Sequence, residues 1–557
     1  MDVALRPCVF ASRTARVELV LAGTHDVVSA LRVPLVAEDA AVGLDEVDTA
    51  ICRWETSLEV PAGTRYWLEV DGVAPLLDPH ALDVVSTEIG PVCVARDPWT
   101  VRPQGRPLGV PPIVYEAHVK GFGGSYAGCI GRLDHVVSVG ANVLELMPVH
   151  PFDGSDNYWG YMPLVWGAVH RGHAADPERA AEELADLVAA AHDNGVHVWL
   201  DVVFNHTGEG DPSLPTRSFR SFDPSVYRSH PDGRRADDSG CGNDADPRHP
   251  WIRSLVIEAL DRYADLGVDG FRFDLASLLT RDGGGLVTLI TEWAARRGVV
   301  LVAEPWDMGG YQVGRGWPWP EWLQWNDRFR DDVRSLVRGE PGQVRAVRRR
   351  VQGSPDLFGT DGPLRSVNFV TAHDGLTMHD LTIVTSDRHR SWDCGPDLRS
   401  QQLKNMFTLL LLSAGTPMWV MGDEFARTQQ GHDNPYDVDG PISWVDWKRA
   451  AEWADLTEYV RALVRLRTEH PPVQFAFHGV GPSIDEGFES RSLAWASNGL
   501  YVMVNAWWEP LEFGLHESGE WQVVLSSTPP VATTVDDDGL RTVTLAPRST
   551  VVLRSVG

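Results

Sequence analysis

The sequence predicts an α/β protein, a (β/α)8 TIM barrel with an N-terminal and a C-terminal β-sandwich domain. Three patterns along its 557 residues support this fold class. Residues 1–100 and 476–557 carry short strand-like runs broken by Gly, Pro and Asp, which are typical of β domains. Between them, short apolar runs alternate with amphipathic stretches, as strands alternate with helices. We therefore expect domains at 1–100, 101–475 and 476–557, with a linker rich in Pro and Gly at 97–112.

In the first domain the alternating runs are ARVELVLAG, ALRVPLVA and RYWLEVDG, and in the last they are GLYVMVNAWW, EWQVVLSS, LRTVTLAP and STVVLRS. Neither zone contains a convincing long helix, and alternation with a period of two indicates strands that are buried on one face. Both terminal zones are therefore predicted to be all-β.

The central zone predicts eight parallel strands: IVYEAH, ANVLELMPV, VHVWLDVVF, VDGFRF, VVLVAE, WLQWN, RSVNFVTA and PMWVMG. The best helix candidates between them are 177–195, 251–267, 286–298 and 456–470. Uniformly apolar strands that alternate with helices indicate a parallel sheet covered on both faces. Eight such units suit a closed barrel with an insertion after the third strand. The alternative, a doubly wound open sheet, would usually carry a GxGxxG turn, which this sequence lacks.

Composition excludes several classes of partner. The chain has 77 acidic against 49 Lys and Arg residues, a formal net charge of −28, which argues against nucleic acid and anionic lipid. No apolar run approaches the ~20 residues of a membrane span, and the start does not resemble a signal peptide. Six scattered cysteines without a CxxC pair predict free thiols. We expect a cytoplasmic protein with no nucleic-acid or membrane partner and no cofactor.

Polar residues end several of the predicted barrel strands, where the chemistry of such barrels takes place. They are Asp201, Asn205, His206, Arg272, Asp274, Glu304, His373 and Asp374. Taken singly, each has a plain structural explanation: an Asp caps a helix or forms a turn, a His is hydrogen-bonded, and an Arg forms a salt bridge. Their joint occurrence at the same end of the strands favours a site in which the carboxylates face one another.

Several carboxylates without a Cys/His cluster, a Ser–His pair or a phosphate loop point to glycoside hydrolysis. Arg272 and Asp274 are two apart on one strand, so their side chains share a face and the guanidinium favours an ionised nucleophile. Glu304 lies between apolar residues, which raise the pKa of a carboxyl group and suit a general acid.

Aromatic residues near the strand ends offer flat apolar faces for sugar rings. Trp159, Tyr161 and Trp306 are the candidates we assign to substrate binding. Tyr158, Trp317, Trp319, Trp322 and Trp325 lie in the same segments, and several of them are expected to belong to the core.

Four segments, DVVFNH, GFRFDLAS, AEPWD and VTAHDG, resemble the catalytic segments of the α-amylase superfamily in the right order. Further segments, among them VYEAHVKGF, NYWGYMPLVWGA, GCGN, SWDCG and GDEFARTQQGHDNPY, look like those of isoamylase-like bacterial glycogen debranching enzymes. The resemblance extends from residue 76 to the end of the predicted barrel.

The resemblance implies a retaining double displacement in which Asp274 is the nucleophile, Glu304 the general acid/base and Asp374 the transition-state stabiliser. It also implies that Arg272 orients the nucleophile, His206 and His373 bind hydroxyls of the sugar, Tyr161 stacks on it, and Asp201 supports the site. Asn205 occupies a position where some relatives bind calcium, but we expect no obligatory metal. The N-terminal domain would be of the glycogen-binding type.

The implied reaction is hydrolysis of α-1,6 branch linkages in an α-glucan such as glycogen or limit dextrin. One alternative is an α-1,4-acting hydrolase or 4-α-glucanotransferase on the same fold, acting on maltooligosaccharides; a remote one is a non-catalytic glucan-binding protein. The sequence departs from the family in two places. The loop at 376–390 is short, and a segment containing GPW and RFNP is missing before LLDPH at 76–80.

Overall fold

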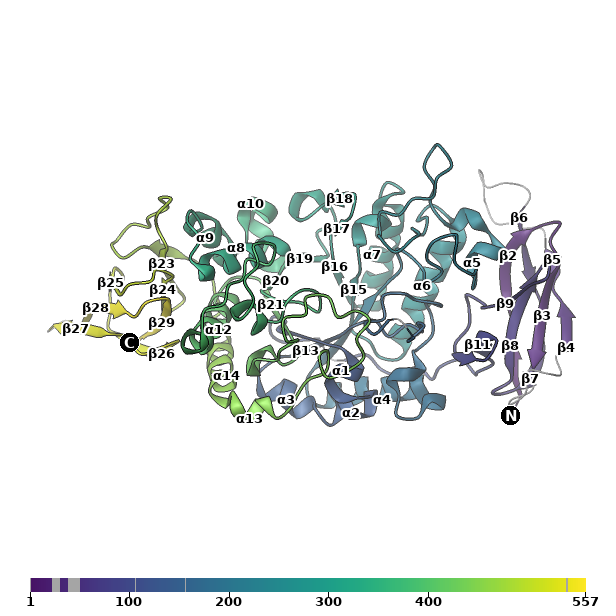
Figure 1. Cartoon of the computed structure of the whole chain (residues 1–557), viewed down its shortest axis with the longest axis horizontal. Helices are drawn as coiled ribbons and strands as arrows, with labels where there is room; N and C mark the ends of the chain where they lie inside the picture. Colours follow the sequence, from purple (N-terminus) through teal and green to yellow (C-terminus); the bar gives the residue numbers. More distant parts are fainter. Residues whose placement is uncertain are drawn as a thin grey trace.

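The computed structural model describes residues 2–22, 31–38, 51–105, 107–155, 157–536 and 539–556. Figure 1 shows three bodies in a row along the long axis: N-terminal β-sheets at one end, a barrel in the middle, and C-terminal β-sheets at the other end. The closed barrel of eight parallel strands, with β-rich parts on both sides, confirms the predicted fold class.

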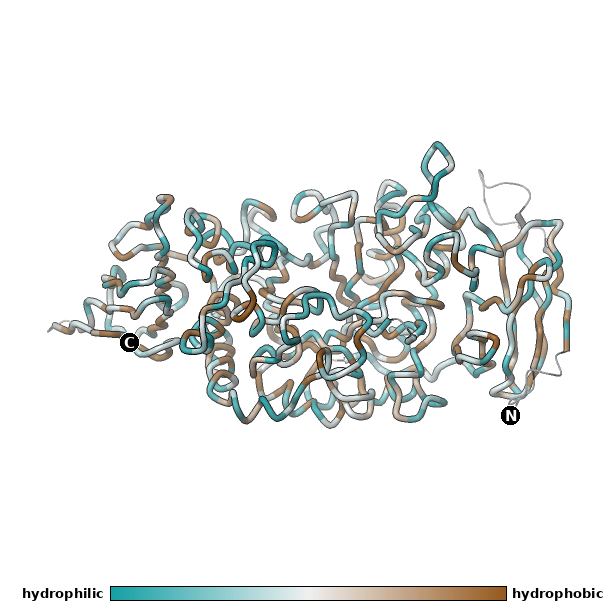
Figure 2. Tube along the Cα trace, viewed as in Figure 1, coloured by the Kyte–Doolittle hydropathy of each residue, from teal (hydrophilic) through white to brown (hydrophobic). Residues whose placement is uncertain are grey.

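The N-terminal strands are β1 (Asp2–Leu5), β2 (Cys8–Ser12), β3 (Val17–Ala22), β4 (Leu31–Pro34), β5 (Val36–Glu38), β6 (Ile51–Glu55), β7 (Leu58–Pro61), β8 (Arg65–Val70), β9 (Val73–Leu76), β10 (Val84–Thr87) and β11 (Gly90–Val94). They form antiparallel sheets in the orders β10-β11-β8-β3-β4, with β9 on β8, and β2-β6-β5, while β1 pairs with β7. Apolar and polar residues are interspersed along these strands in Figure 2. In β2, for example, Val9 and Ala11 are buried and their neighbours are half-buried, so one face of the sheet covers the core.

The barrel strands are β12 (Val114–Ala117), β13 (Val143–Leu146), β14 (His197–Val202), β15 (Gly270–Phe273), β16 (Val300–Ala303), β19 (Leu323–Asn326), β20 (Ser366–Phe369) and β21 (Thr416–Val420). They correspond to the eight predicted runs, and β21 closes the barrel by pairing with β12. The short strands β17 (Trp306–Asp307) and β18 (Gly310–Tyr311) form a hairpin after β16.

The helices are α1 (Val119–Gly123), α2 (Tyr126–Ile130), α3 (Leu133–Ser138), α4 (Ala180–Asp193), α5 (Phe219–Phe222), α6 (Pro250–Asp265), α7 (Gly285–Arg297), α8 (Asp327–Arg338), α9 (Val344–Val351), α10 (Pro355–Phe358), α11 (Gly362–Arg365), α12 (Pro396–Leu411), α13 (Arg449–Glu452) and α14 (Ala454–Glu469). The four helices predicted from periodicity are confirmed as α4, α6, α7 and α14. A long connection joins β14, the third barrel strand, to β15.

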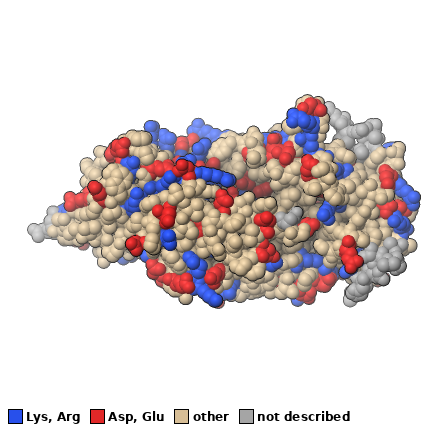
Figure 3. All heavy atoms as spheres, viewed as in Figure 1, with Lys and Arg blue, Asp and Glu red and all other residues tan. Residues whose placement is uncertain are grey.

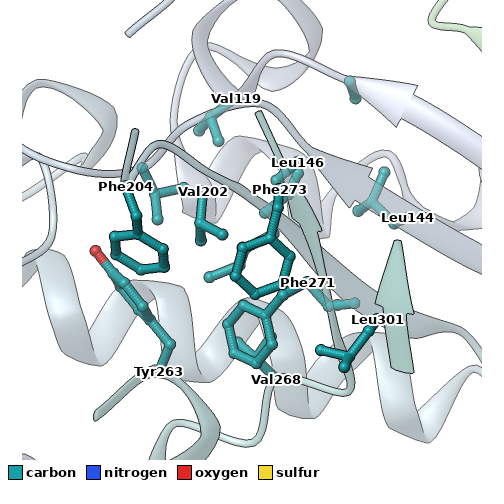
Figure 4. Close-up of a cluster of buried hydrophobic side chains, with 14 of the residues drawn as sticks. Val119, Leu144, Leu146, Val202, Phe204, Tyr263, Val268, Phe271, Phe273 and Leu301 are labelled. Atoms are coloured by element: carbon teal, nitrogen blue, oxygen red, sulfur yellow. The ribbon is translucent and has the colours of Figure 1, made fainter. Parts of the chain in front are cut away.

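Side chains of the barrel strands alternate between two apolar layers. Those that point outward pack under the helices, as Leu144, Leu146, Phe271 and Phe273 do in Figure 4. Those that point inward fill the floor of the barrel: Val114, Val143, Trp199, Val302, Trp325, Val367, Phe369 and Met418. The polar ends of the strands therefore stand on a closed apolar floor rather than on an open channel.

The C-terminal strands are β22 (Ala476–His478), β23 (Ser492–Ser497), β24 (Leu500–Asn505), β25 (Leu511–Gly514), β26 (Trp521–Ser526), β27 (Ala532–Asp536), β28 (Gly539–Leu545) and β29 (Ser549–Ser555). They form sheets in the orders β22-β23-β24-β29-β26 and β25-β28-β27, which enclose a core containing Tyr501, Phe513, Val543 and Leu553. Asn405 of α12 donates to the carbonyl of Arg548 at 2.6 Å, which ties the barrel to these sheets.

The N-terminal sheets are fastened to the barrel by charge and by aromatic packing. Asp83 accepts from Arg96 Nε at 2.7 Å and from Arg171 Nε at 2.6 Å, and Phe10 packs on Trp251 with ring centroids 5.3 Å apart. On the face in Figure 3, acidic and basic side chains lie interspersed among uncharged residues. Cys8, Cys93, Cys129, Cys241 and Cys394 are free thiols, as predicted. Within the described residues, no helix is both long enough and apolar enough to cross a membrane.

The floor of the barrel predicts a steric test at Gly270. A Cβ atom there would lie 2.6 Å from Cδ1 of Trp199, a ring with no exposed surface. Gly270→Ala should therefore lower the free energy of unfolding by about 1–3 kcal/mol in urea denaturation, as overpacking does. Gly109→Ala is the matched control, because no atom lies within 4 Å of the position that its Cβ would take, and its change should stay within about 0.5 kcal/mol. Equal effects of the two substitutions would contradict the steric argument.

Candidate active site

The polar residues that end the predicted strands converge at one end of the barrel, and Arg272 lies at their centre. Its side chain is 1% exposed. Nη1 donates to Asp201 at 2.9 Å and to Asp274 Oδ1 at 3.2 Å, and Nη2 lies 3.0 Å from Glu304 Oε2. The guanidinium carbon lies 4.1 Å from the ring centroid of Trp325. One buried cation thus joins three carboxyl groups from β14, the end of β15 and the end of β16.

Asp274 follows β15 directly and is 9% exposed. Besides Arg272 it has a second donor, because Asn205 Nδ2 lies 2.8 Å from its Oδ2 atom. The same amide nitrogen also donates to the backbone carbonyl of Asp274 at 2.8 Å. Donors on both carboxylate oxygens fix the orientation of this group at the mouth of the barrel.

Glu304 follows β16, and its environment differs from that of Asp274. Burial raises the pKa of Glu304 to about 8; Arg272 opposes this shift and the negative charge of Asp274 adds to it. The backbone N–H of Leu275 donates to Oε2 at 2.8 Å. At neutral pH this carboxyl group therefore keeps its proton, which a general acid requires.

Asp374 is exposed at the mouth of the barrel. Enclosure by the walls of the cleft raises its pKa, but the positive charges of His373, Arg330 and Arg272 outweigh this effect and hold the pKa below its ordinary value. Asp374 and Glu304 line the same cleft, whose volume is about 460 Å³. An ionised carboxylate thus lies across the cleft from a protonated one.

Asp201 and Tyr161 support this arrangement. Tyr161 donates its hydroxyl to Asp201 Oδ2 at 2.5 Å, and its ring stacks on His373 with centroids 4.9 Å apart. Burial raises the pKa of Asp201 to about 6 despite the opposing charge of Arg272. Trp159 meets the ring of His373 edge-on at 5.1 Å. Trp159, Tyr161 and Asp201 therefore form one connected group around His373.

His206 does not have the geometry expected of a group that binds a sugar hydroxyl. It is 1% exposed, and both ring nitrogens already face protein acceptors: Nδ1 lies 2.6 Å from Asn205 Oδ1, and Nε2 lies 2.6 Å from the carbonyl of Tyr161. Burial lowers the pKa of His206, but Cys241 and Asp274 have the larger, opposite effect, and the pKa is raised to about 9. His206 therefore fixes the positions of Asn205 and Tyr161.

The aromatic residues divide into wall and core. Trp306 and Trp325 line the cleft. Tyr158, Trp317 and Trp322 are buried, so for these three a role in sugar stacking is excluded. Trp317 and Trp322 pack against each other with centroids 5.3 Å apart, which explains why a Trp-rich loop has turned inward.

Several cleft residues were not predicted from the sequence. The β17–β18 hairpin places Met308 and Tyr311 at the cleft, and α8 contributes Asp327 and Arg330. The sequence signal for the hairpin is the Gly309–Gly310 pair, which stands one residue after the segment AEPWD. Glu116 was also missed, because a single acid within the apolar run IVYEAH gives no pattern.

The side chain of Asn205 uses its amide nitrogen on Asp274 and its oxygen on His206. In the part of the chain that the structure describes, no group of three His, Cys, Asp or Glu side chains is arranged to hold a metal ion.

Removing the central cation tests how strongly the site depends on it. Arg272→Met should lower the free energy of unfolding at pH 8 by about 3–5 kcal/mol, because it removes the cation that neutralises three buried carboxyl groups. The loss should shrink at pH 5, where those carboxyl groups can take up protons. Arg461→Met, which removes a half-exposed partner of Glu458, is the control and should cost no more than about 1 kcal/mol. Urea unfolding at both pH values measures this, and a loss that does not depend on pH would contradict it.

The chain is similar in sequence to two kinds of glucan-related protein. No protein-family model matches the chain. The glycogen operon protein GlgX homologue of Mycobacterium tuberculosis is 35% identical over 504 residues, covering 79% of this chain and 69% of that protein. The chloroplastic isoamylase SU1 of Zea mays is 32% identical over 512 residues, covering 74% of this chain and 65% of that protein.

Solved structures of pullulanases share the fold. The apo pullulanase of Paenibacillus barengoltzii superposes with a TM-score of 0.81 at 21% identity, covering 99% of this chain and 93% of that one. The pullulanase of Anoxybacillus sp. LM18-11 in complex with maltotetraose gives a TM-score of 0.80 at 23% identity, covering 100% and 87%. The GlgX homologue and isoamylase SU1, together with the ordered strand-end motifs, show that the chain belongs to the α-amylase superfamily. Within it the chain belongs to the branch of isoamylase-like bacterial glycogen debranching enzymes.

Proposed function

We propose that this protein is a retaining glycoside hydrolase that cleaves the α-1,6 branch linkages of glycogen or of its limit dextrin. The observation that carries the proposal is that Asp274 and Glu304 share the guanidinium of Arg272 while Glu304 alone is held protonated. A shared guanidinium keeps the two carboxyl groups close together, and retaining enzymes need a separation of about 5–5.5 Å. The membership of the family supports the linkage.

In the proposed reaction the carboxylate of Asp274 attacks the anomeric carbon while Glu304 gives its proton to the glycosidic oxygen. The bond between the anomeric carbon and the glycosidic oxygen breaks. The products of this step are a free hydroxyl on the former branch point and a glycosyl ester on Asp274. Glu304, now ionised, then removes a proton from water, whose oxygen attacks the anomeric carbon and releases Asp274. Asp374 stabilises the positive charge that develops on the sugar in both steps.

The surroundings of the cleft support a neutral polysaccharide as substrate. Trp159, Tyr161 and Trp306 provide aromatic surface beside the carboxyl groups. The relatives are named for glycogen and isoamylase activity, and one pullulanase structure holds maltotetraose. We therefore propose α-glucans as the binding partners: glycogen, limit dextrin and maltooligosaccharides.

For the flanking parts we propose the division 1–100, 101–475 and 476–557, with an N-terminal domain of the glycogen-binding type. Its attachment through Asp83 to Arg171, a residue before α4, supports a fixed position relative to the barrel. We further propose a cytoplasmic location, because free thiols such as Cys93 and Cys129, which have no exposed surface, suit a reducing compartment.

The linkage is tested with two substrates. Fed phosphorylase-limit dextrin, the enzyme should release short linear maltooligosaccharides, and it should leave a pure linear maltooligosaccharide intact. Glu304→Gln should lower turnover by about four orders of magnitude or more while glycogen binding persists, whereas the exposed Glu321→Gln should behave as wild type. Shortening of the linear substrate would instead indicate an α-1,4 hydrolase, and a mixture of longer and shorter chains a glucanotransferase. Binding without any release would indicate a non-catalytic glucan-binding protein.

The pH profile tests the assignment of the acid. The general acid must carry its proton, and its pKa is raised to about 8 rather than lowered, so kcat/KM should stay high at pH 7. Above pH 8 it should fall, approaching tenfold per pH unit. Because Asp274 and Glu304 interact, this limb reports the pair. A decline that already begins near pH 5, as for an unperturbed glutamate, would refute the assignment.

A further inference from the structure

We propose that Glu116 is a positioning residue: it orients His373 and keeps that ring doubly protonated, so that the Nε2–H group is presented to the bound sugar. The part concerning the sugar rests on the proposed function. Glu116 lies on β12, the first barrel strand, far in sequence from the strand-end residues of the site, and its side chain is 1% exposed. A carboxylate buried to this degree is costly unless it is paired.

The partner of Glu116 is His373. Glu116 Oε1 lies 2.7 Å from His373 Nδ1, so the ring donates this proton to the carboxylate. The Tyr161 hydroxyl also approaches Nδ1, at 3.3 Å, but it gives its own proton to Asp201. Among the described residues, Nε2 of His373 has no hydrogen-bond partner. The nitrogen that faces away from Glu116 is therefore the one left for substrate.

Other groups hold the ring in place and set its charge. Tyr161 stacks on one face, Trp159 meets the ring edge-on, and Trp325 lies 6.1 Å away. Burial lowers the pKa of His373, but the charge and the hydrogen bond of Glu116, together with Asp374, raise it to about 9, while Arg272 acts in the opposite direction. With Glu116 in place the ring thus carries a positive charge beside Asp374 at neutral pH.

Glu145 provides a matched control within the same barrel. It stands opposite Glu116 in the register of β12 and β13 and is also 1% exposed. Its Oε1 atom has no hydrogen-bond partner among the described residues, and burial raises its pKa well above the ordinary value. Glu145 is therefore a neutral acid in the folded protein, and Glu145→Gln replaces it with a group of similar shape and the same charge.

The experiment compares Glu116→Gln, Glu116→Asp and Glu145→Gln by two measurements. The first is the pKa of His373, followed by NMR of protein with labelled histidine, with the signal assigned from its absence in His373→Asn. The second is kcat and KM on limit dextrin across pH. Glu116→Gln should lower the pKa of His373 by at least about one unit. It should also lower kcat/KM at pH 7 by about 10–100-fold, as loss of an orienting partner does.

The deficit of Glu116→Gln should narrow as the pH falls and His373 takes up its second proton again. Glu116→Asp should recover part of both properties, because it keeps the charge. Glu145→Gln should leave the titration of His373 unchanged and kcat/KM within about threefold of wild type. An unshifted His373 in Glu116→Gln, or an equal shift in Glu145→Gln, would overturn the proposal.

Two further comparisons keep the outcome decisive. If Glu116→Gln does not fold, Glu116→Asp still tests the idea. An unchanged pKa of His373 in Glu116→Asp, or activity that does not change together with that pKa, would overturn the proposal. The NMR measurement needs no substrate. If wild type releases no linear chains from limit dextrin while His373 shifts as expected, the proposed function fails and the Glu116–His373 coupling stands. If wild type debranches and Glu116→Gln matches it in both measurements, the coupling alone fails.

Discussion

The guanidinium of Arg272 is buried between Asp201, Asp274, Glu304 and the face of Trp325, and the rest of the site depends on how this single cation is shared. A buried charge is tolerated only when it is well paired, and here three acids surround one base. One positive charge cannot neutralise three negative ones, so ionising all three buried carboxyl groups at once is unfavourable. Asp274 and Glu304 each have one donor besides Arg272, Asn205 Nδ2 and the backbone N–H of Leu275 respectively, but burial and the negative charge of Asp274 raise the pKa of Glu304 to about 8. The proton therefore stays on Glu304, and the two carboxyl groups acquire different functions from one shared contact.

The barrel brings these groups together through strand register. Asp201 on β14 pairs directly with Arg272 on β15, and Arg272 pairs with Val302 on β16. Two residues before Arg272, Gly270 leaves room for Trp199, which closes the barrel below the charges. Since successive inward positions are two residues apart, one step along β15 separates the apolar floor from the charged layer. Water is thereby excluded from below the site, which strengthens each electrostatic contact above it.

The sequence was sufficient to predict the features that depend on local pattern. Eight apolar runs became the eight strands, and the polar residues that end them converge, because parallel strands of a barrel end on the same side. It was not sufficient where the deciding contact is distant. One ring nitrogen of His206 faces the backbone carbonyl of Tyr161, 45 residues earlier, and Glu116 pairs with a histidine 257 residues later.

In the Trp-rich loop, too, the sequence alone does not predict where each side chain packs. Trp317, Trp322 and Trp325 share one short segment, yet the first two are fully buried in the layer under the helices while Trp325 faces Arg272 inside the barrel. An aromatic ring can pack in a core, on a cation or on a sugar, so spacing in the sequence does not show which of these a given Trp will do. Only the path of the chain between β18 and β19 decides among them.

The net charge of −28 does not describe the reaction centre. Around the cleft, the cations Arg272, His206, His373 and Arg330 stand near the anions Asp274, Asp374 and Glu116, while burial keeps the proton on Glu304. This near balance suits a substrate that enters without charge. It also suits the proposed transition state, because the positive charge on the sugar forms between Asp274 and Asp374, the two acids that can respond to it. His373, held cationic by Glu116, then keeps Asp374 ionised while the sugar is still neutral, so the stabilising charge is in place before the bond begins to break.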